Sequence, residues 1–335
     1  MTTITLFAGD GIGPEISAAV SRIIQSVCPD ITFEPCEIGQ TAYEHTGELI
    51  PQSAIDSLEK NRIALKGPCT TPVGKGFRSV NVQLRTRFDL YQNIRPAKSL
   101  PSVSTRFSDV NLVVFRENTE DLYIGEEIMI SPDEAHAVKK ITRTASERII
   151  RAAFEYARSH SRKRVTCVHK ANILKLTDGL FLHIFQEIAP QYPDLTADSR
   201  IVDNMCMQLV IDPEDYDVLV MPNLYGDILS DLVSGLIGGL GVMPSAQIGS
   251  KYAVFEAVHG SAPDIAGKGI ANPTALLLSA CMMLDYMGRP DHAQAIRAAV
   301  NTVLADTDSR TRDLGGQAST EAYTQALLRA LKTIQ

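Results

Sequence analysis

The sequence predicts an α/β fold, because short apolar runs typical of buried strands alternate with helical apolar patterns along most of its 335 residues. Hydrophobic residues make up 44% of the chain and charged residues 21%, which supplies a sizeable core and argues against disorder. No linker-like stretch divides the chain. A second domain is therefore expected to be an insertion, which the chain crosses into and out of.

The elements follow from the spacing of apolar residues. A strand is expected at Ile4–Ala8, followed by a glycine turn and a helix that begins at Pro14. Further buried strands are expected at Ile63–Leu65, Asn111–Phe115, Arg164–Val168, Val218–Met221 and Tyr252–Glu256. Helical spacing covers Glu147–Arg158, Thr177–Ala189 and Gly226–Ile237. The stretch between Tyr123 and Arg143 is poorly patterned, so an arm or an exchanged hairpin is expected there.

Composition narrows the class of partner. A formal charge of −7 and a pI of about 5.6 argue against nucleic acid or an anionic membrane as the main partner. No apolar run reaches the roughly 18 residues of a membrane span. The first residues lack a basic leader region, and the six cysteines show no CxxC spacing. Together these features predict a cytoplasmic protein, or one of the mitochondrial matrix if a leader has been removed.

The turn Gly9–Pro14 reads G-x-G-x-G-P and lacks the G-x-G-x-x-G spacing of a dinucleotide loop. A tight turn between strand and helix explains it better. The sequence therefore predicts a fold other than the true Rossmann fold.

Four arginines suggest a site for an anion. Arg78 and Arg85 precede the FDLYQNIRP stretch, Arg95 lies within it directly before Pro96, and Arg116 ends an apolar strand. Guanidinium groups bind carboxylates bidentately, so a set of them at strand ends favours a substrate with several carboxylates. Alternatively, each arginine forms an ordinary surface ion pair; the acidic residues that could serve are Asp89, Glu117 and Glu120.

A metal site is one interpretation of three aspartates. Asp227 and Asp231 are four residues apart on an expected helix and project from one face, and Asp203 follows another apolar stretch. Oxygen ligands without histidine or cysteine favour Mg²⁺ or Mn²⁺ over Zn²⁺. The alternative makes Asp227 a helix N-cap and Asp231 a solvated residue.

Two further side chains have chemistry suited to proton transfer. Lys170 follows a strand, where partial desolvation can lower the pKa of a lysine, although a surface lysine is the commoner outcome. Tyr123 is equally compatible with a packed ring. The small residues of the loop from His259 to Asn272 allow close approach of a ligand, and an acidic residue there can bind ribose hydroxyls.

Five long motifs make the chain similar to the β-decarboxylating dehydrogenases, a family of isocitrate, homoisocitrate, 3-isopropylmalate and tartrate dehydrogenases. The motifs are KGPCTTPVGKGFRSVNVQLR, FRENTEDLY, VHKAN, NLYGDILSD and HGSAPDIAGKGIANP. The resemblance extends from GDGIGPEI to TRDLGG and so covers nearly the whole chain.

The resemblance implies a large domain of residues 1–98 and 252–335, which binds the cofactor, and a small domain of residues 99–251. An arm at about residues 124–143 would hold a homodimer together. The fold implied is that of the family, with the active site in the cleft between the domains.

The resemblance also implies residue roles. Arg85, Arg95 and Arg116 would bind the α- and β-carboxylates of the substrate, and Ser79 and Asn81 its γ-carboxylate. Asp227 and Asp231, with Asp203 of the second chain, would ligate Mg²⁺ or Mn²⁺. Lys170 of the second chain would take the hydroxyl proton, and Tyr123 would protonate the product carbon. NAD would be bound by Thr70, Thr71, His259, Gly260, Ser261, Ala262, Asp264, Ile265 and Asn272.

Two pairs of residues indicate the subtype. Ser79 and Asn81 match isocitrate enzymes, and Asp264 and Ile265 match NAD⁺-dependent rather than NADP⁺-dependent members. The implied activity is the oxidative decarboxylation of isocitrate to 2-oxoglutarate and CO₂, a step of the tricarboxylic acid cycle. A homoisocitrate or dual-specificity enzyme is the nearest alternative, since one methylene changes binding by only ~1–3 kcal/mol. A non-catalytic regulatory subunit is the alternative from another class.

Overall fold

A mixed sheet of ten strands forms the centre of the molecule. The computed structural model describes residues 1–70 and 78–334. In order across the sheet, the strands are β2 (Ile31–Cys36), β1 (Thr2–Phe7), β3 (Ile63–Lys66), β12 (Ala253–Ala257), β11 (Pro244–Ile248), β4 (Gln92–Lys98), β5 (Asn111–Glu117), β10 (Val218–Met221), β8 (Arg164–His169) and β9 (Thr196–Ile201). The predicted α/β class is confirmed.

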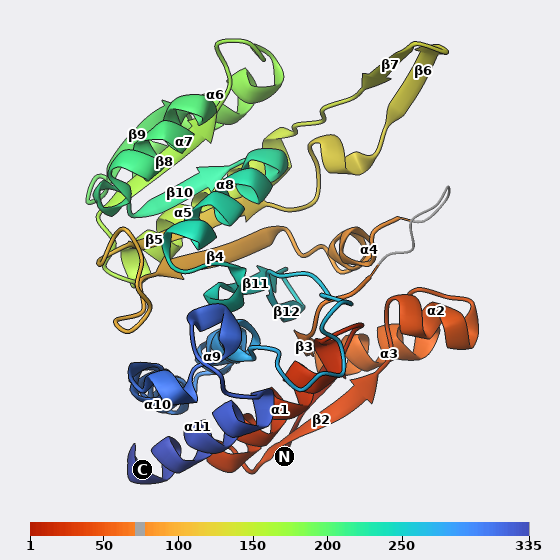
Figure 1. The fold of residues 1–335 in the computed structure, drawn as a ribbon. Helices are drawn as coiled ribbons and strands as arrows, with labels where there is room; N and C mark the ends of the chain where they lie inside the picture. Colours follow the sequence, from red (N-terminus) through yellow and green to blue (C-terminus); the bar gives the residue numbers. More distant parts are fainter. Residues whose placement is uncertain (71–77, 335) are drawn as a thin grey trace.

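The sheet consists of two parallel halves joined by antiparallel strands. Strands β2, β1, β3 and β12 run parallel in one half, and β5, β10, β8 and β9 run parallel in the other. Between them, β11 is antiparallel to both β12 and β4, and β4 is antiparallel to β5. The two central strands therefore connect the halves into one continuous sheet (Figure 1).

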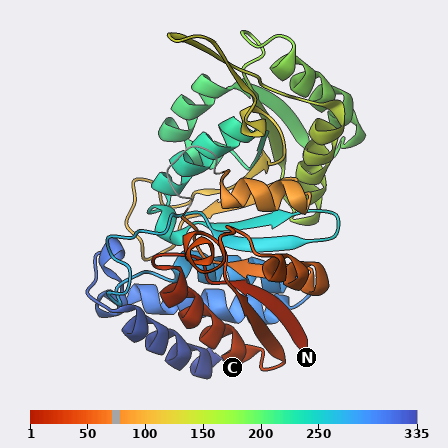
Figure 2. The same cartoon turned by 90° about the vertical axis from the view of Figure 1, so that its right-hand side faces the viewer.

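Helices cover both faces of the first half. One face packs against α1 (Gly13–Val27), α9 (Thr274–Tyr286), α10 (Pro290–Ala305) and α11 (Thr320–Ile334). The other face packs against α3 (Gln52–Asn61) and α4 (Val80–Arg87), and α2 (Gln40–Thr46) lies beside them (Figure 1). The N- and C-terminal residues lie at the same end of the molecule (Figures 1 and 2).

The second half is also covered on both faces. Here α5 (Arg143–Ser159) and α6 (Thr177–Ile188) pack on one face, and α7 (Val202–Ile211) and α8 (Asn223–Leu236) on the other. Short 3₁₀ turns complete the chain: η1 (Leu122–Ile124), η2 (Ala189–Gln191), η3 (Pro213–Asp215), η4 (Leu240–Val242), η5 (Thr307–Ser309) and η6 (Arg312–Leu314). No described helix is long and apolar enough to cross a membrane.

A two-stranded hairpin extends from the second half (Figure 1). It consists of β6 (Glu127–Ser131) and β7 (Glu134–Ala137), which pair only with each other, and all of its strand residues are exposed. This hairpin lies within the segment predicted to form an arm. The function of the arm and the domain boundaries at residues 98 and 252 stay predictions.

The expected boundaries shift where local chemistry decides them. Helix α5 begins at Arg143, earlier than expected, because the Thr142 hydroxyl caps it by accepting a hydrogen bond from the Ala145 amide. The apolar pattern did not predict β11, whose buried residues include Ser245 and Gln247. Strand β11 is held by neighbours on both sides, so burial there does not require an apolar sequence.

Phe154 of α5 offers a test of this packing. Its ring is fully buried and stacks on Tyr192 at 4.6 Å and on Phe185 at 5.4 Å between centroids. We expect Phe154→Ala to lower the free energy of unfolding by about 3–5 kcal/mol, and Phe154→Leu by less than about 1.5 kcal/mol. Urea unfolding followed by circular dichroism measures both. Equal losses for the two variants would contradict the predicted packing role.

Candidate active site

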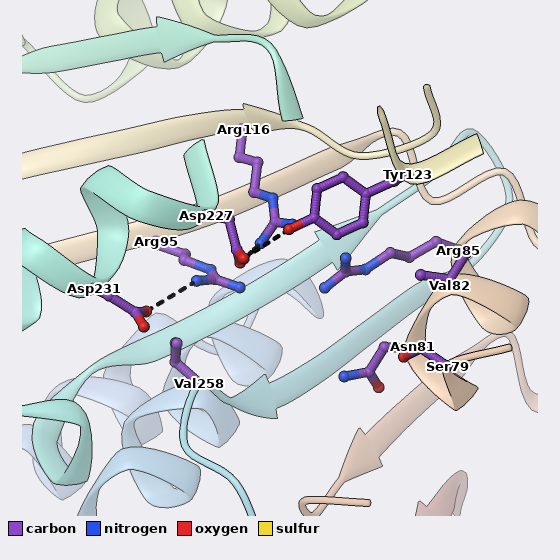
Figure 3. Close-up of a pocket in the computed structure, with 10 residues that line it drawn as sticks. All are labelled: Ser79, Asn81, Val82, Arg85, Arg95, Arg116, Tyr123, Asp227, Asp231 and Val258. Atoms are coloured by element: carbon purple, nitrogen blue, oxygen red, sulfur yellow. Dashed lines mark hydrogen bonds and ion pairs between the residues drawn. The ribbon is translucent and has the colours of Figure 1, made fainter. Parts of the chain in front are cut away.

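A cavity of about 260 Å³ lies where the two halves of the sheet meet (Figure 3). Its lining residues are Ser79, Asn81, Val82, Arg85, Arg95, Arg116, Tyr123, Asp227, Asp231 and Val258. A neighbouring cavity of about 130 Å³ shares Asn81, Arg85, Arg95 and Val258 with it and continues toward His259 and Gly260. The structure thus brings together eight of the residues predicted for substrate, metal and catalysis.

Three arginines form the floor of the larger cavity. Arg85 comes from α4, Arg95 from β4 and Arg116 from the end of β5, and their exposed fractions are 6%, 5% and 1%. Arg85 Nε donates to Gln247 Oε1 at 2.7 Å, and Arg95 donates to Ser230 Oγ at 2.6 Å. The alternative of ordinary surface ion pairs is wrong for these three. Arg78 is exposed and instead donates to the Ile124 carbonyl at 2.7 Å.

Arg116 organises the opposite wall. It donates to Asn223 Oδ1 at 2.9 Å and forms an ion pair with Asp227, and its guanidinium lies 5.0 Å from the centre of the Tyr123 ring. The Tyr123 hydroxyl donates to the second oxygen of Asp227 at 2.7 Å (Figure 3). Gly226 allows helix α8 to approach this closely, since a Cβ there would lie 2.4 Å from Arg116 Cγ.

The cavity has a strongly cationic floor. Burial and the neighbouring Arg116 lower the pKa of Arg85 to about 10 and that of Arg95 to about 9, so both stay charged at neutral pH. Burial favours the neutral form of Asp227, but Arg116 lowers the pKa of this carboxyl below its usual value. Buried cations without enough counter-charge are costly, and a ligand with several carboxylates would compensate them.

Asp227 and Asp231 extend from helix α8 on the same side of the cavity. Helix α8 begins at Asn223 after Pro222, so the alternative that Asp227 is the N-cap is wrong. The Asp231 side chain is 62% exposed and lies 4.0 Å from Arg95. Figure 3 shows Asp231 at one side of the cavity and Ser79 at the other. Two carboxylates without thiol or imidazole partners suit a hard divalent cation.

Lys170 and Asp203 lie elsewhere. Lys170 Nζ is 2.6 Å from Asp203 Oδ1, their side chains are 28% and 68% exposed, and neither lines the cavity. Among the described residues, no group of three or more histidine, cysteine or acidic side chains is arranged to hold a metal ion. A single chain therefore provides two of the three predicted metal ligands at this cavity.

The residues predicted to bind the cofactor gather around the turn at Gly9–Pro14. The Thr70 and Ser261 hydroxyls share a hydrogen bond of 2.6 Å, and the Thr70 amide donates to Asp10 Oδ2 at 2.7 Å. The Ile12 amide donates to the Ser261 carbonyl. The turn at Gly9–Pro14 thus connects the loops that carry Thr70 and Ser261, in agreement with its interpretation as a structural turn. Thr71 lies outside the described residues.

The remaining cofactor candidates occupy the loop after β12. Nε2 of His259 is buried without a hydrogen-bond partner, and burial lowers the pKa of this imidazole. Ala262 has a positive φ of 41°, Asp264 is exposed and Ile265 is half-buried. The Asn272 amide donates to Asp313 at 2.8 Å, which fixes the end of the loop. The unpaired Nε2 of His259 and the exposed carboxylate of Asp264 suit a polar ligand such as a nucleotide.

Comparison with known proteins identifies the family. The sequence profile described as isocitrate/isopropylmalate dehydrogenase matches residues 3–329. The chain belongs to this family. The resemblance inferred from the motifs is thereby confirmed, together with the family fold.

Relatives within the isocitrate/isopropylmalate dehydrogenase family share about half of the sequence. Isocitrate dehydrogenase [NAD] subunit alpha, mitochondrial, of Homo sapiens is 50% identical over 99% of this chain and 91% of its own length. Subunit 2 of the mitochondrial NAD enzyme of Schizosaccharomyces pombe is 49% identical over 98% and 88%. The crystal structure of isocitrate dehydrogenase from Methylococcus capsulatus superposes with a TM-score of 0.96 at 52% identity, covering 99% of this chain and all of that one.

A buried polar network beneath the arginines was missed by sequence reasoning. Lys66 of β3 and Glu256 of β12 are directly opposite in the sheet, with an ion-pair distance of 2.5 Å. Gln247 donates to Glu256 and accepts from Arg85, and the Asn118 amide also donates to it. Burial alone would raise the pKa of Glu256, but Lys66 and Arg85 lower it. The sequence does contain one sign of this network. Each of the two apolar strands carries a charged residue at or next to its end, Lys66 in β3 and Glu256 in β12.

Gly226 and Gly235 provide a matched test on helix α8. Gly226→Ala places a methyl group against Arg116, whereas nothing lies within 4 Å of a Cβ at Gly235. We expect Gly226→Ala to destabilise the protein by about 1–3 kcal/mol through overpacking. Gly235→Ala should be neutral or stabilising by up to about 1 kcal/mol because alanine favours helix. Urea unfolding compares them, and a stable Gly226→Ala protein would contradict the close approach.

Proposed function

We propose that this chain catalyses the NAD-dependent oxidative decarboxylation of isocitrate to 2-oxoglutarate and CO₂, assisted by Mg²⁺ or Mn²⁺. The observation that carries the proposal is the set of three buried arginines facing two carboxylates across one cavity. The names of the relatives agree with the isocitrate and NAD predictions made from Ser79, Asn81, Asp264 and Ile265.

The arginines would orient the substrate. Arg85, Arg95 and Arg116 bind its α- and β-carboxylates, and Ser79 and Asn81, on the far side of the cavity from Asp231, bind its γ-carboxylate. Arg95 and Arg116 are fixed on strands and by hydrogen bonds, so little conformational freedom is lost when the substrate binds. A carboxylate only accepts hydrogen bonds, so Asn81 would donate to it from Nδ2 and Ser79 from its hydroxyl.

Asp227 and Asp231, with the partner subunit's Asp203, would hold the divalent cation beside the substrate hydroxyl. A cation held there would supply a Lewis acid for the substrate hydroxyl and positive charge to offset the negative charge of decarboxylation. NAD⁺, held by the residues around Thr70 and the loop from His259 to Asn272, would supply the hydride acceptor.

Protons would be moved by two side chains. Lys170 of the partner subunit would take the hydroxyl proton as hydride leaves the carbon that bears the hydroxyl. The bond between the neighbouring carbon and the β-carboxylate would then break to release CO₂. Tyr123 donates its proton to the carbon that is left. Burial raises the pKa of Tyr123, so its phenol keeps the proton at neutral pH and can act as an acid.

A second copy of the chain is the proposed partner, with active sites shared between protomers. Exposed apolar side chains on adjacent helices support it, namely Met207, Val210 and Ile211 of α7 and Ile228 of α8, as do Ile128, Met129 and Ile130 of the hairpin. The eukaryotic relatives are named as mitochondrial subunits, which makes a hetero-oligomer the alternative assembly. A cytoplasmic location stays a prediction.

Initial rates test the proposed activity. With Mg²⁺, the purified protein is expected to form NADH from isocitrate much faster than from homoisocitrate or 3-isopropylmalate, and EDTA should abolish the reaction. A preference for homoisocitrate would contradict the prediction that Ser79 and Asn81 select isocitrate. No turnover of any of these acids at saturating metal would favour a regulatory subunit.

The cofactor preference has its own test. Asp264 would accept hydrogen bonds from the ribose hydroxyls of NAD⁺ and repel the phosphate of NADP⁺. We expect Asp264→Lys with Ile265→Tyr to shift the ratio of kcat/KM values toward NADP⁺ by at least about tenfold, since removing one charge repulsion is worth a few kcal/mol. The exposed Lys268→Ala serves as a control. An unchanged ratio would count against the role of Asp264.

A further inference from the structure

A nearly buried lysine lies at the base of the hairpin and outside the cavity. Lys139 follows β7, and its side chain is 11% exposed. Its ammonium is 2.5 Å from Asp178 Oδ1 and 3.7 Å from Asp121 Oδ1, and both carboxylates are fully buried. It also donates to the Tyr225 hydroxyl at 3.3 Å and lies 4.3 Å from the centre of that ring.

Each contact of Lys139 leads to a different part of the proposed catalytic machinery. Asp121 accepts hydrogen bonds from the Leu122 amide, at the start of the turn that carries Tyr123, and from the Leu224 amide. Asp178 accepts a hydrogen bond of 2.6 Å from the Lys170 amide. Tyr225 precedes Asp227 by two residues on helix α8.

Lys139 supplies the positive charge of the cluster that it forms with Asp121, Asp178 and Tyr225. Asp121 is held at a φ of +73°, a conformation that non-glycine residues rarely adopt, and its carboxylate is tied to two amides. Removal of the Lys139 ammonium would leave two buried carboxylates facing one phenol. A buried charge without its partner is strongly unfavourable, so the segments that carry these groups would have to move.

We propose that Lys139 is a positioning residue that fixes groups of two active sites at once: Tyr123 and Asp227 of its own site, and the Lys170 that its chain contributes to the partner's site. This inference rests on the proposed function with shared sites. The hairpin is thereby connected to the chemistry of both sites, not only to assembly.

Steady-state kinetics give the first test. We expect Lys139→Met to lower kcat on the order of 100-fold through displaced catalytic groups, while the KM for isocitrate changes much less, because the three arginines have no contact with Lys139. The matched control is Lys140→Met, which removes an exposed neighbouring ammonium and should leave kcat unchanged. Equal kcat for Lys139→Met and wild type would overturn the proposal.

Mixed dimers give the decisive test. Two differently tagged chains are co-expressed and the hybrid is purified. A hybrid of wild type with Arg95→Met should keep about half of the activity, since one of its sites is complete. A hybrid of wild type with Lys139→Met should fall well below half, because one site has a displaced Tyr123 and the other a displaced Lys170.

Failure of the inference can be told from failure of the shared site. Arg95→Met and Lys170→Met, each inactive alone, should together restore activity in one of two sites; no restoration would overturn the shared-site proposal. If that pair complements but the Lys139→Met hybrid keeps half of the activity, Lys139 acts in one site only and the inference is wrong. Should Lys139→Met fail to fold, Asp178→Ala tests the link to Lys170, because it removes the acceptor of the Lys170 amide together with the charge that pairs with Lys139. Its hybrid with wild type should keep about half, because only the partner's site loses its positioned lysine.

Discussion

The ion pair between Arg116 and Asp227 lies where strand β5 ends against helix α8, and it is the contact on which the site depends. It fixes a guanidinium at the floor of the cavity and a carboxylate at its wall, and Tyr123 is bound to the same carboxylate. The glycine at position 226 is required because the helix backbone lies against the arginine stem. This one contact between a strand and a helix thus joins the two elements, holds an arginine for anion binding and positions Tyr123, the proposed acid.

The second constraint is the antiparallel pair at the centre of the sheet. Strands β4 and β11 join two parallel halves, and Arg95 and Gln247 come from these two strands. Polar side chains here are tolerated because each is paired, from Lys66 and Glu256 through Gln247 to Arg85. Such a network is rigid, so the arginines are held in place before any substrate binds, which reduces the entropic cost of binding.

The sequence alone predicted most of the residues on the substrate side of the site. Ser79, Asn81, the three arginines, Tyr123, Asp227 and Asp231 were all singled out and all line one cavity. The arginines could not be assigned from spacing alone, since a surface ion pair uses the same residue types. Their exposed fractions of 6% or less decided between the two interpretations. Lys66, Glu256 and Gln247 were missed because the network depends on contacts between residues distant in sequence, Lys66 with Glu256 and Arg85 with Gln247.

The sequence by itself determined the class of fold, the family and the chemistry of the candidate residues, because strand and helix periods and long motifs are local properties of the chain. Only the tertiary structure decided which of those residues meet. It brought Arg85, Arg95 and Arg116 together from a helix and two strands, and it kept Lys170 with Asp203 away from the cavity of the same chain. The physical reason is that side-chain contacts across a sheet depend on strand order and register, which local patterns do not encode.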